Sequence, residues 1–137
     1  MTIDGETKAR IGKGLLILLG VRVGDTSEEA KYLAEKCVNL RIFTDEDGKF
    51  NLSALDVGAE VLVVSQFTLY GDTRKGRRPG FTDAARPEVS EPLYEEFVFW
   101  VKSSGLKTDT GTFGAMMEVH LVNDGPVTIL AEKDHEA

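Results

Sequence analysis

Two long apolar runs stand out along the chain, and each predicts a buried strand. Residues 14–21 are almost continuously apolar, and residues 60–67 (EVLVVSQF) are dense in valine and leucine. Uninterrupted apolar runs of this length are typical of strands inside a layered protein. Shorter runs predict further strands at residues 6–10, 41–44, 114–122 and 127–130. Strands are therefore expected near both ends of the chain.

Between these runs, apolar residues recur with the period of a helix. Thr26 and Glu29 have the spacing of a capping box and predict the start of the first helix. Its apolar face follows the i, i+3, i+4, i+7, i+8 pattern and comprises Ala30, Leu33, Ala34, Cys37 and Val38. A second helix is expected over residues 90–104 with Gly105 as its stop. Its apolar face comprises Leu93, Phe97, Trp100 and Val101.

This order of elements predicts an α+β fold with a layered, mostly antiparallel or mixed β-sheet and two main helices. Cys37 lies on the apolar face of the first helix, so we interpret it as a core side chain and not as a reactive thiol. Residues 131–137 are mostly polar and are expected to fray.

Composition narrows the class of protein. The 137 residues suffice for a sizeable core, and we expect one domain over residues 1–137. One cysteine excludes an internal disulfide and suits a reducing compartment. No apolar run approaches the ~18 residues of a membrane helix, and Asp4 and Glu6 lie where a secretory signal is apolar. We therefore expect a cytoplasmic protein without a membrane partner.

The charge balance is acidic, with one local exception. A net charge of −7 argues against a protein that coats nucleic acid nonspecifically. Residues 74–78, however, hold four of the sixteen basic residues, namely Arg74, Lys75, Arg77 and Arg78. Such a run is usually a solvated loop. Because this one follows a predicted strand end, a contact with nucleic acid stays open.

Conventional catalytic machinery is sparse. The only histidines are His120, which we place on the wetter face of its strand, and His135 in the polar tail. A single cysteine and two remote histidines cannot form a zinc site, and no phosphate-binding glycine loop is present. Polar residues do follow the strongest strand, where Ser65, Gln66 and Thr68 supply hydroxyl and amide groups. Free backbone N–H groups there could hold an oxyanion.

The stretch LVNDGPVTI at residues 121–129 is unusual because a Gly-Pro pair stands between two apolar flanks. Gly125 and Pro126 interrupt a strand-like pattern because proline removes a donor from the ladder and glycine loosens the backbone. One interpretation is a tight turn, where an X-Pro bond tolerates the cis form at a cost of ~0.5–1 kcal/mol. The other is that this backbone is itself a recognition element.

The motifs VSQFTL and LVNDGPVTI together closely resemble the two signature motifs of the D-aminoacyl-tRNA deacylases, also called D-Tyr-tRNA deacylases. Further similar stretches occur in the family order and extend the resemblance over essentially the whole chain: GLLILLG (14–20), LRIF (40–43), Asn51-Leu52, Arg78-Pro79 and FGAMMEV (113–119). One departure is expected. Family members begin with an extra strand carrying a Gln-Arg-Val stretch, and this chain starts after that strand.

The resemblance implies hydrolysis of the ester that links a D-amino acid, or glycine, to the 3′ adenosine of a tRNA. It implies a homodimer in the cytosol that needs no metal or organic cofactor. Its partner would be aminoacyl-tRNA, and DNA would not be a partner. Gly125 and Pro126, with Thr128 nearby, would form a Gly-cis-Pro element inserted into the partner subunit's site. Its carbonyl oxygens would hold the ammonium group, and an L side chain would strike the backbone.

Ser65, Gln66, Phe67 and Thr68 would form the ester-binding side of the site. The family offers two mechanisms, with the Thr68 hydroxyl as nucleophile or with the 2′-hydroxyl of the tRNA performing the chemistry. The sequence favours the second, since no base is evident beside Thr68. The basic residues Arg74, Lys75, Arg77 and Arg78 would contact the tRNA backbone.

Two other functions remain open from the sequence. A sister type of deacylase presents a trans Gly-Pro and clears mischarged L-alanine from tRNA. Residues 123–126 (NDGP) favour the D-specific type. From another class, the chain could be a noncatalytic module that binds tRNA or nucleotides.

Overall fold

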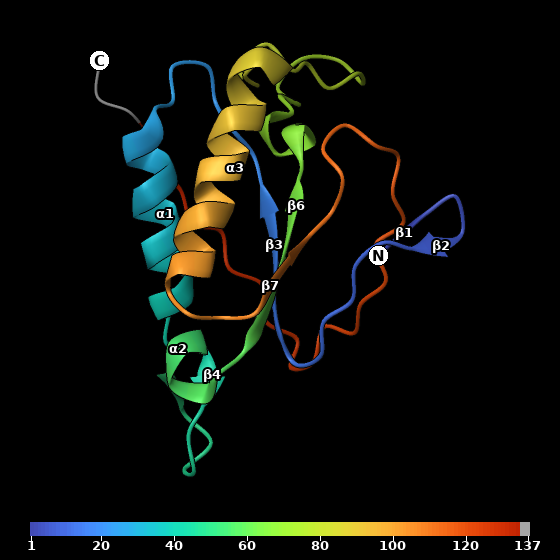
Figure 1. Cartoon of the computed structure of the whole chain (residues 1–137). Helices are drawn as coiled ribbons and strands as arrows, with labels where there is room; N and C mark the ends of the chain where they lie inside the picture. The colour runs from blue at the N-terminus through green and yellow to red at the C-terminus, as the bar shows by residue number, and fades with distance from the viewer. Residues whose placement is uncertain (135–137) are drawn as a thin grey trace.

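The computed structural model describes residues 1–134 and is built around a three-stranded sheet (Figure 1). Its strands are β3 (Gly14–Leu19), β6 (Glu60–Ser65) and β7 (Thr108–Thr110), in the order β3-β6-β7. Both pairs are parallel, with Leu15 opposite Val61 and Val61 opposite Thr108. β3 and β6 approach closely where they begin, because a Cβ added at Gly14 would lie 1.8 Å from the Glu60 carbonyl oxygen. Glycine is required there.

Two long helices, α1 (Ser27–Asn39) and α3 (Pro87–Ser103), pack together on one face of this sheet (Figure 1). The core between them contains Phe97 and Val101 of α3 against Val61 and Val63 of β6, all with no exposed surface. The hydroxyl of Tyr94 donates a hydrogen bond to the Val63 carbonyl at 3.1 Å. These contacts attach α3 to the central strand.

The other face of β6 is also covered. Leu62 and Val64 are 6% and 2% exposed and pack with Met1 and Ala9. Partly buried apolar residues complete this second cluster, namely Ile3, Ile11, Leu16, Met117 and Val119. Burial on both faces explains why the β6 sequence is apolar without alternation.

The remaining elements are short. Two antiparallel hairpins pair β1 (Thr2–Ile3) with β2 (Glu6–Thr7) and β4 (Phe43–Thr44) with β5 (Phe50–Leu52). Helix α2 (Ala54–Val57) begins at a capping box formed by Ser53 and Asp56. The 3-10 helix η1 (Phe67–Tyr70) follows β6 directly.

The predicted α+β class with two main helices is confirmed; strands pair in parallel in the central sheet and antiparallel in the two hairpins. Thr26 caps α1 by accepting a hydrogen bond from the Glu28 backbone N–H. Helix α3 begins three residues earlier than the predicted residue 90, because Pro87 stands at its first position, where a missing N–H costs nothing. Cys37 packs against the helix–sheet core as expected, and burial raises the pKa of its thiol to about 11.

The strands predicted at residues 114–122 and 127–130 are wrong, since neither segment forms a strand. Residues 111–120 do alternate between half-buried and exposed, and Met117 and Val119 lie against the second core cluster. A turn interrupts the segment, closed by a 3.1 Å hydrogen bond from the Ala115 N–H to the Thr112 carbonyl. After this turn, the only β-bridge within residues 1–134 pairs Glu118 with Thr2. An extended segment without a neighbouring backbone makes no sheet. The His120 side chain is 66% exposed, on the wetter side as predicted.

The expected fraying of the tail is also wrong for residues 131–134. This segment lies along α1, where the Lys133 ammonium sits 5.0 Å from the centre of the Tyr32 ring. Asp134 forms an ion pair with Arg22 at 3.3 Å. Residues 135–137, including His135, lie outside the described part of the chain. No helix within residues 1–134 is long and apolar enough to cross a membrane.

Replacing Phe97 by alanine is expected to lower the free energy of unfolding by about 3–5 kcal/mol, because the ring is fully buried and leaves a cavity. Phe99, two residues away and 59% exposed, provides the control, with an expected loss below about 1 kcal/mol. Urea denaturation followed by circular dichroism measures both. Equal losses would contradict the assignment of the core.

Candidate functional site

The polar residues that follow β6 come together at one end of the sheet. Ser65 is the last residue of β6, and the Gln66 backbone N–H donates to the Leu19 carbonyl at 2.8 Å, one step beyond the ladder. The chain then turns into η1, closed by a hydrogen bond from the Gly71 N–H to the Thr68 carbonyl at 2.9 Å. Ser65, Gln66, Phe67 and Thr68 therefore form one group, here called the strand-end cluster.

Hydrogen bonding within the strand-end cluster bears on its chemistry. The side-chain amide of Gln66 donates to the Thr68 hydroxyl oxygen. The backbone N–H groups of Phe67 and Thr68 open η1, where the first N–H groups have no acceptor within the helix. Burial, together with the nearby carboxylate of Asp25, raises the pKa of the Tyr70 phenol. That hydroxyl is therefore protonated at neutral pH and is no general base.

Exposed aromatic rings lie beside these polar groups. The Phe67 ring is 57% exposed and meets Phe81 edge-on, with ring centres 5.2 Å apart. Two glycines allow close packing around η1, one against Leu69 and one against Phe81. A Cβ at Gly20 would lie 3.1 Å from the Leu69 Cβ, and a Cβ at Gly71 would lie 3.2 Å from the Phe81 Cε1. Sequence reasoning missed Phe81, because nothing in a Pro-Gly-Phe stretch indicates which ring the phenylalanine meets.

Residues 72–80 form a short loop, here called the basic hairpin. Asp72 and Gly80 close it with two backbone hydrogen bonds of 2.7 and 2.9 Å. At its start, Arg74 binds both carboxylate oxygens of Asp72, at 2.9 and 2.7 Å. These bonds hold the pKa of Asp72 at about 2.

The four basic residues of the hairpin are therefore not equivalent. The positive charge of Arg74 is already balanced by Asp72. The side chains of Lys75, Arg77 and Arg78 are exposed and make no ion pair or hydrogen bond within residues 1–134. These three charges remain available to a ligand.

The second predicted group lies in an exposed turn, here called the Gly-Pro turn (residues 123–128). The Gly125-Pro126 peptide bond is cis, and the φ angle of Gly125 is 142°. Asn123 ties the turn together, because its side chain accepts from the Val127 N–H at 2.8 Å and donates to the Thr128 hydroxyl at 3.0 Å. Sequence reasoning missed Asn123, although an asparagine that bonds nearby backbone is a known turn signal.

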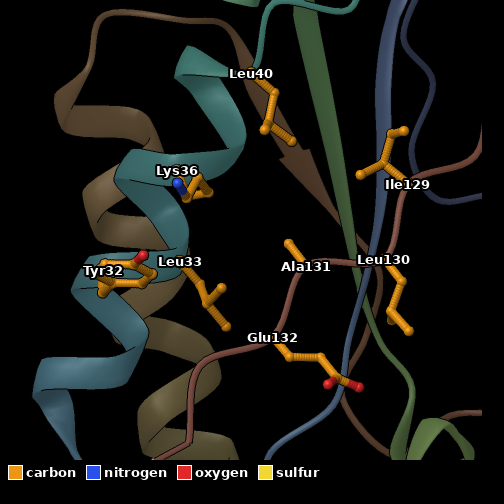
Figure 2. Close-up of a pocket in the computed structure, with 8 residues that line it drawn as sticks. All are labelled: Tyr32, Leu33, Lys36, Leu40, Ile129, Leu130, Ala131 and Glu132. Atoms are coloured by element: carbon orange, nitrogen blue, oxygen red, sulfur yellow. The ribbon is translucent and has the colours of Figure 1, made fainter.

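One chain does not bring the two groups together. Figure 1 shows the orange-red segment after residue 120 passing the end of the sheet where β3 begins, whereas η1 lies at the end where β6 finishes. From the turn, the chain runs back past α1, and residues 129–132 line a hollow whose other side is formed by Tyr32, Leu33, Lys36 and Leu40 of α1 and its end (Figure 2). No hydrogen bond, ion pair or ring contact within residues 1–134 joins the Gly-Pro turn to the strand-end cluster.

The hollow in Figure 2 is a separate feature. It encloses about 240 Å³ between α1 and the C-terminal segment and contains no residue of either group. Residues 1–134 also contain no cluster of three or more histidine, cysteine or acidic side chains that could hold a metal ion. The candidate site is therefore made of backbone, amide, hydroxyl and aromatic groups.

Comparison with known proteins identifies the class to which this arrangement belongs. Residues 1–132 match the family model described as D-Tyr-tRNA(Tyr) deacylase. The protein named D-aminoacyl-tRNA deacylase from Roseiflexus castenholzii is 62% identical over 132 residues, covering 96% of this chain and 84% of that protein. Its namesake from Halothermothrix orenii is 56% identical over 136 residues, covering 99% and 91%.

Two solved structures share the fold. One described as c-Myc DNA Unwinding Element Binding Protein superposes with a TM-score of 0.91 at 40% identity, covering 98% of this chain and 91% of that one. A probable eukaryotic D-amino acid tRNA deacylase shares the fold, with a TM-score of 0.68 at 20% identity. The chain belongs to the D-Tyr-tRNA(Tyr) deacylase family and is a hydrolase. The predicted family and enzyme class are confirmed.

The ion pair at the base of the hairpin predicts a pH dependence. Because the folded pKa of Asp72 is about 2, below its ordinary value of 3.8, the contribution of this carboxylate to folding is complete above pH 4 and is lost as the pH falls through 2. An NMR titration of the Asp72 carboxyl carbon should show a midpoint near 2 in the native protein. In Arg74→Ala the midpoint should rise toward 3.8. An unchanged midpoint would contradict the pairing.

Proposed function

We propose that the enzyme hydrolyses the ester of D-aminoacyl-tRNA and of glycyl-tRNA, and that the Gly-Pro turn of a second copy completes each site. One observation carries the proposal: the Gly-Pro turn is exposed and lies at the opposite end of the sheet from the strand-end cluster (Figure 1). Two motifs that serve one reaction can then meet only between subunits. A two-fold dimer supplies two such sites, since each chain gives and receives the same element.

The surface around the turn supports a second copy. Large apolar side chains there are unusually exposed: Met116 and Val122 at 90%, Leu130 at 75%, Leu121 at 59% and Ile129 at 52%. Large apolar side chains exposed along one segment, here residues 116–130, are typical of an interaction site on a protein surface. Residues 116–122 also pair with another strand of residues 1–134 only at the Glu118–Thr2 bridge, so a partner strand could bond to their remaining backbone groups.

Selection among amino acids is assigned to the backbone of the turn. Carbonyl oxygens of Gly125 and Pro126 would accept hydrogen bonds from the substrate ammonium group. With ammonium and ester both held, an L side chain would collide with the turn, whereas a D side chain points away from it. Many D side chains are accepted because no protein side chain reads them. Glycine, which has no side chain, is accepted too.

We assign binding of the ester to the strand-end cluster. The N–H groups of Phe67 and Thr68 would bind the oxyanion that develops on the carbonyl oxygen. The Thr68 hydroxyl accepts a hydrogen bond from Gln66 and has no base in contact within residues 1–134, which disfavours it as a nucleophile. We therefore assign positioning to Thr68 and activation of the attacking water to the 2′-hydroxyl of the substrate.

We assign part of the contact with the tRNA body to the basic hairpin. Lys75, Arg77 and Arg78 would neutralise backbone phosphates, while Arg74 keeps its partner Asp72. This revises the prediction that all four basic residues contact tRNA. A local patch of this kind reconciles an acidic enzyme with an RNA substrate.

Release of amino acid from D-Tyr-, L-Tyr-, Gly- and L-Ala-tRNA tests the function. We expect fast loss of the D-tyrosyl and glycyl esters, with both L esters spared. Preferential loss of the L-alanyl ester would instead indicate the sister deacylase, and binding without turnover of any ester would indicate a noncatalytic module.

The variant Gly125→Ala should lower hydrolysis of D-Tyr-tRNA by at least about tenfold. An added Cβ would lie 2.9 Å from the Val127 Cγ2, at a φ of 142° that other residues rarely adopt, so the carbonyl groups must move. Gly48→Ala is the matched control, because it also replaces a glycine with positive φ in an exposed turn, without any atom within 4 Å of the new Cβ. Activity should be retained there. Equal losses would contradict a role for the Gly-Pro turn.

Mixing subunits tests the crossed arrangement. Thr68→Ala damages the ester side and Gly125→Ala damages the turn, so each homodimer should be weakly active. After subunit exchange, one site in each mixed dimer pairs two intact elements, and about a quarter of all sites should recover. Rates of D-Tyr-tRNA hydrolysis before and after mixing measure the recovery. Absence of recovery, with exchange verified by native mass spectrometry, would place both elements within one chain.

A further inference from the structure

A ring and three unpaired charges lie together just beyond the strand-end cluster. Phe81 follows the basic hairpin directly, is 37% exposed, and meets Phe67 with ring centres 5.2 Å apart. It also lies over the base of the hairpin, since a Cβ at Gly71 would come 3.2 Å from its ring and 3.8 Å from Pro79. Phe81 therefore connects the ester side of the site to the hairpin.

The hairpin is held in shape by its own contacts. Two backbone hydrogen bonds join Asp72 to Gly80, and the Asp72 carboxylate accepts from both the Arg74 backbone and its guanidinium group. Phe81 is thereby placed at the foot of a closed loop whose tip carries Lys75, Arg77 and Arg78. Figure 1 shows this yellow-green loop projecting from the end of the sheet where β6 finishes.

A positive loop beside an exposed aromatic ring is the combination that binds single-stranded nucleic acid. The charges follow the phosphates, and a base stacks on the ring without regard to its identity. The charge contrast is strong here, because these side chains belong to a protein whose net charge is −7. An acidic ligand without aromatic groups would use the charges but not the ring.

We propose that Phe81 and the basic hairpin bind the single-stranded nucleotides that precede the terminal adenosine of the tRNA, with a base on the ring and phosphates on Lys75, Arg77 and Arg78. This subsite rests on the proposed function, which puts the ester at the strand-end cluster next to Phe67. The 3′ strand must leave the ester in some direction. The neighbouring ring and the unpaired charges define that direction as toward the hairpin.

The subsite implies that substrate length matters. Three D-tyrosyl esters separate the contributions: the ester of adenosine alone, of the 5′-phosphorylated trinucleotide CCA, and of intact tRNA. The native enzyme should hydrolyse all three, with kcat/KM rising from adenosine to CCA. In Phe81→Ala, kcat/KM for the CCA ester should fall at least about fivefold, the low end of base stacking on an aromatic ring. The adenosine ester should be unaffected.

Two further variants guard against a structural effect. Phe81→Tyr keeps a ring and should retain the gain from adenosine to CCA. Phe50→Ala removes a phenylalanine that is 56% exposed at the unrelated β4–β5 hairpin, and it should change neither substrate. Sedimentation of Phe81→Ala should match that of the native protein. A loss of self-association would reassign the ring to a contact between protein chains.

Charge is tested separately through salt dependence on intact tRNA. Replacing Lys75, Arg77 and Arg78 by alanine should make the slope of log kcat/KM against log salt shallower by about 2, as for three phosphates on a single strand. Arg74→Ala should change the slope much less, because that charge is paired with Asp72. Lys49→Ala, at the β4–β5 hairpin, is the control for loss of one exposed charge.

The outcomes separate this inference from the proposed function. If the native enzyme cleaves the adenosine ester but gains nothing from CCA, the subsite is overturned and the function stands. Equal losses on both substrates in Phe81→Ala would also overturn it, because the ring would then act through Phe67 at the ester. If the native enzyme cleaves no ester of any length, the proposed function fails and the subsite fails with it.

Discussion

Burial of β6 on both faces is the constraint on which the candidate site depends. Val61 and Val63 pack against the helices, while Leu62 and Val64 pack against the N-terminal segment. A shift of one residue would exchange the two sets of side chains between two different clusters, so the register is strongly specified. The point where the strand leaves the sheet is therefore fixed. The Gln66 N–H, bonded to the Leu19 carbonyl, continues this register one step into the polar group.

The same constraint explains which features the sequence could predict. Periodicity located α1 and α3 because local spacing determines which face is buried, and an unbroken apolar run located β6. The polar group after β6 was equally visible. Strands expected at residues 114–122 and 127–130 failed because an apolar, alternating segment needs a neighbouring backbone, and local sequence does not say whether one is present. The contacts of Phe81 with Phe67, and of Asn123 with Val127, join positions whose proximity only the fold decides.

Separation of the two motifs within one chain has a chemical consequence. A rigid strand end presents the groups assigned to the ester, whereas an exposed turn clasped by Asn123 presents the carbonyl groups assigned to the ammonium. If the two elements meet only across an interface, the geometry of chiral selection is set by how two folded units dock. Docking of preformed surfaces moves backbone little. Selection by backbone atoms then needs no side chain that adapts to the substrate.

The distribution of positive charge is also local. Wide positive surfaces would hold any RNA along its length, since phosphate contacts carry no sequence information. Here the basic hairpin carries three positive side chains without an ion pair within residues 1–134, whereas Arg74 is paired with Asp72. An acidic protein with so few free positive charges would hold RNA weakly unless a further contact formed. A free 3′ end could form that further contact, because its unpaired bases can stack on an exposed ring such as Phe81. Bases in duplex regions cannot.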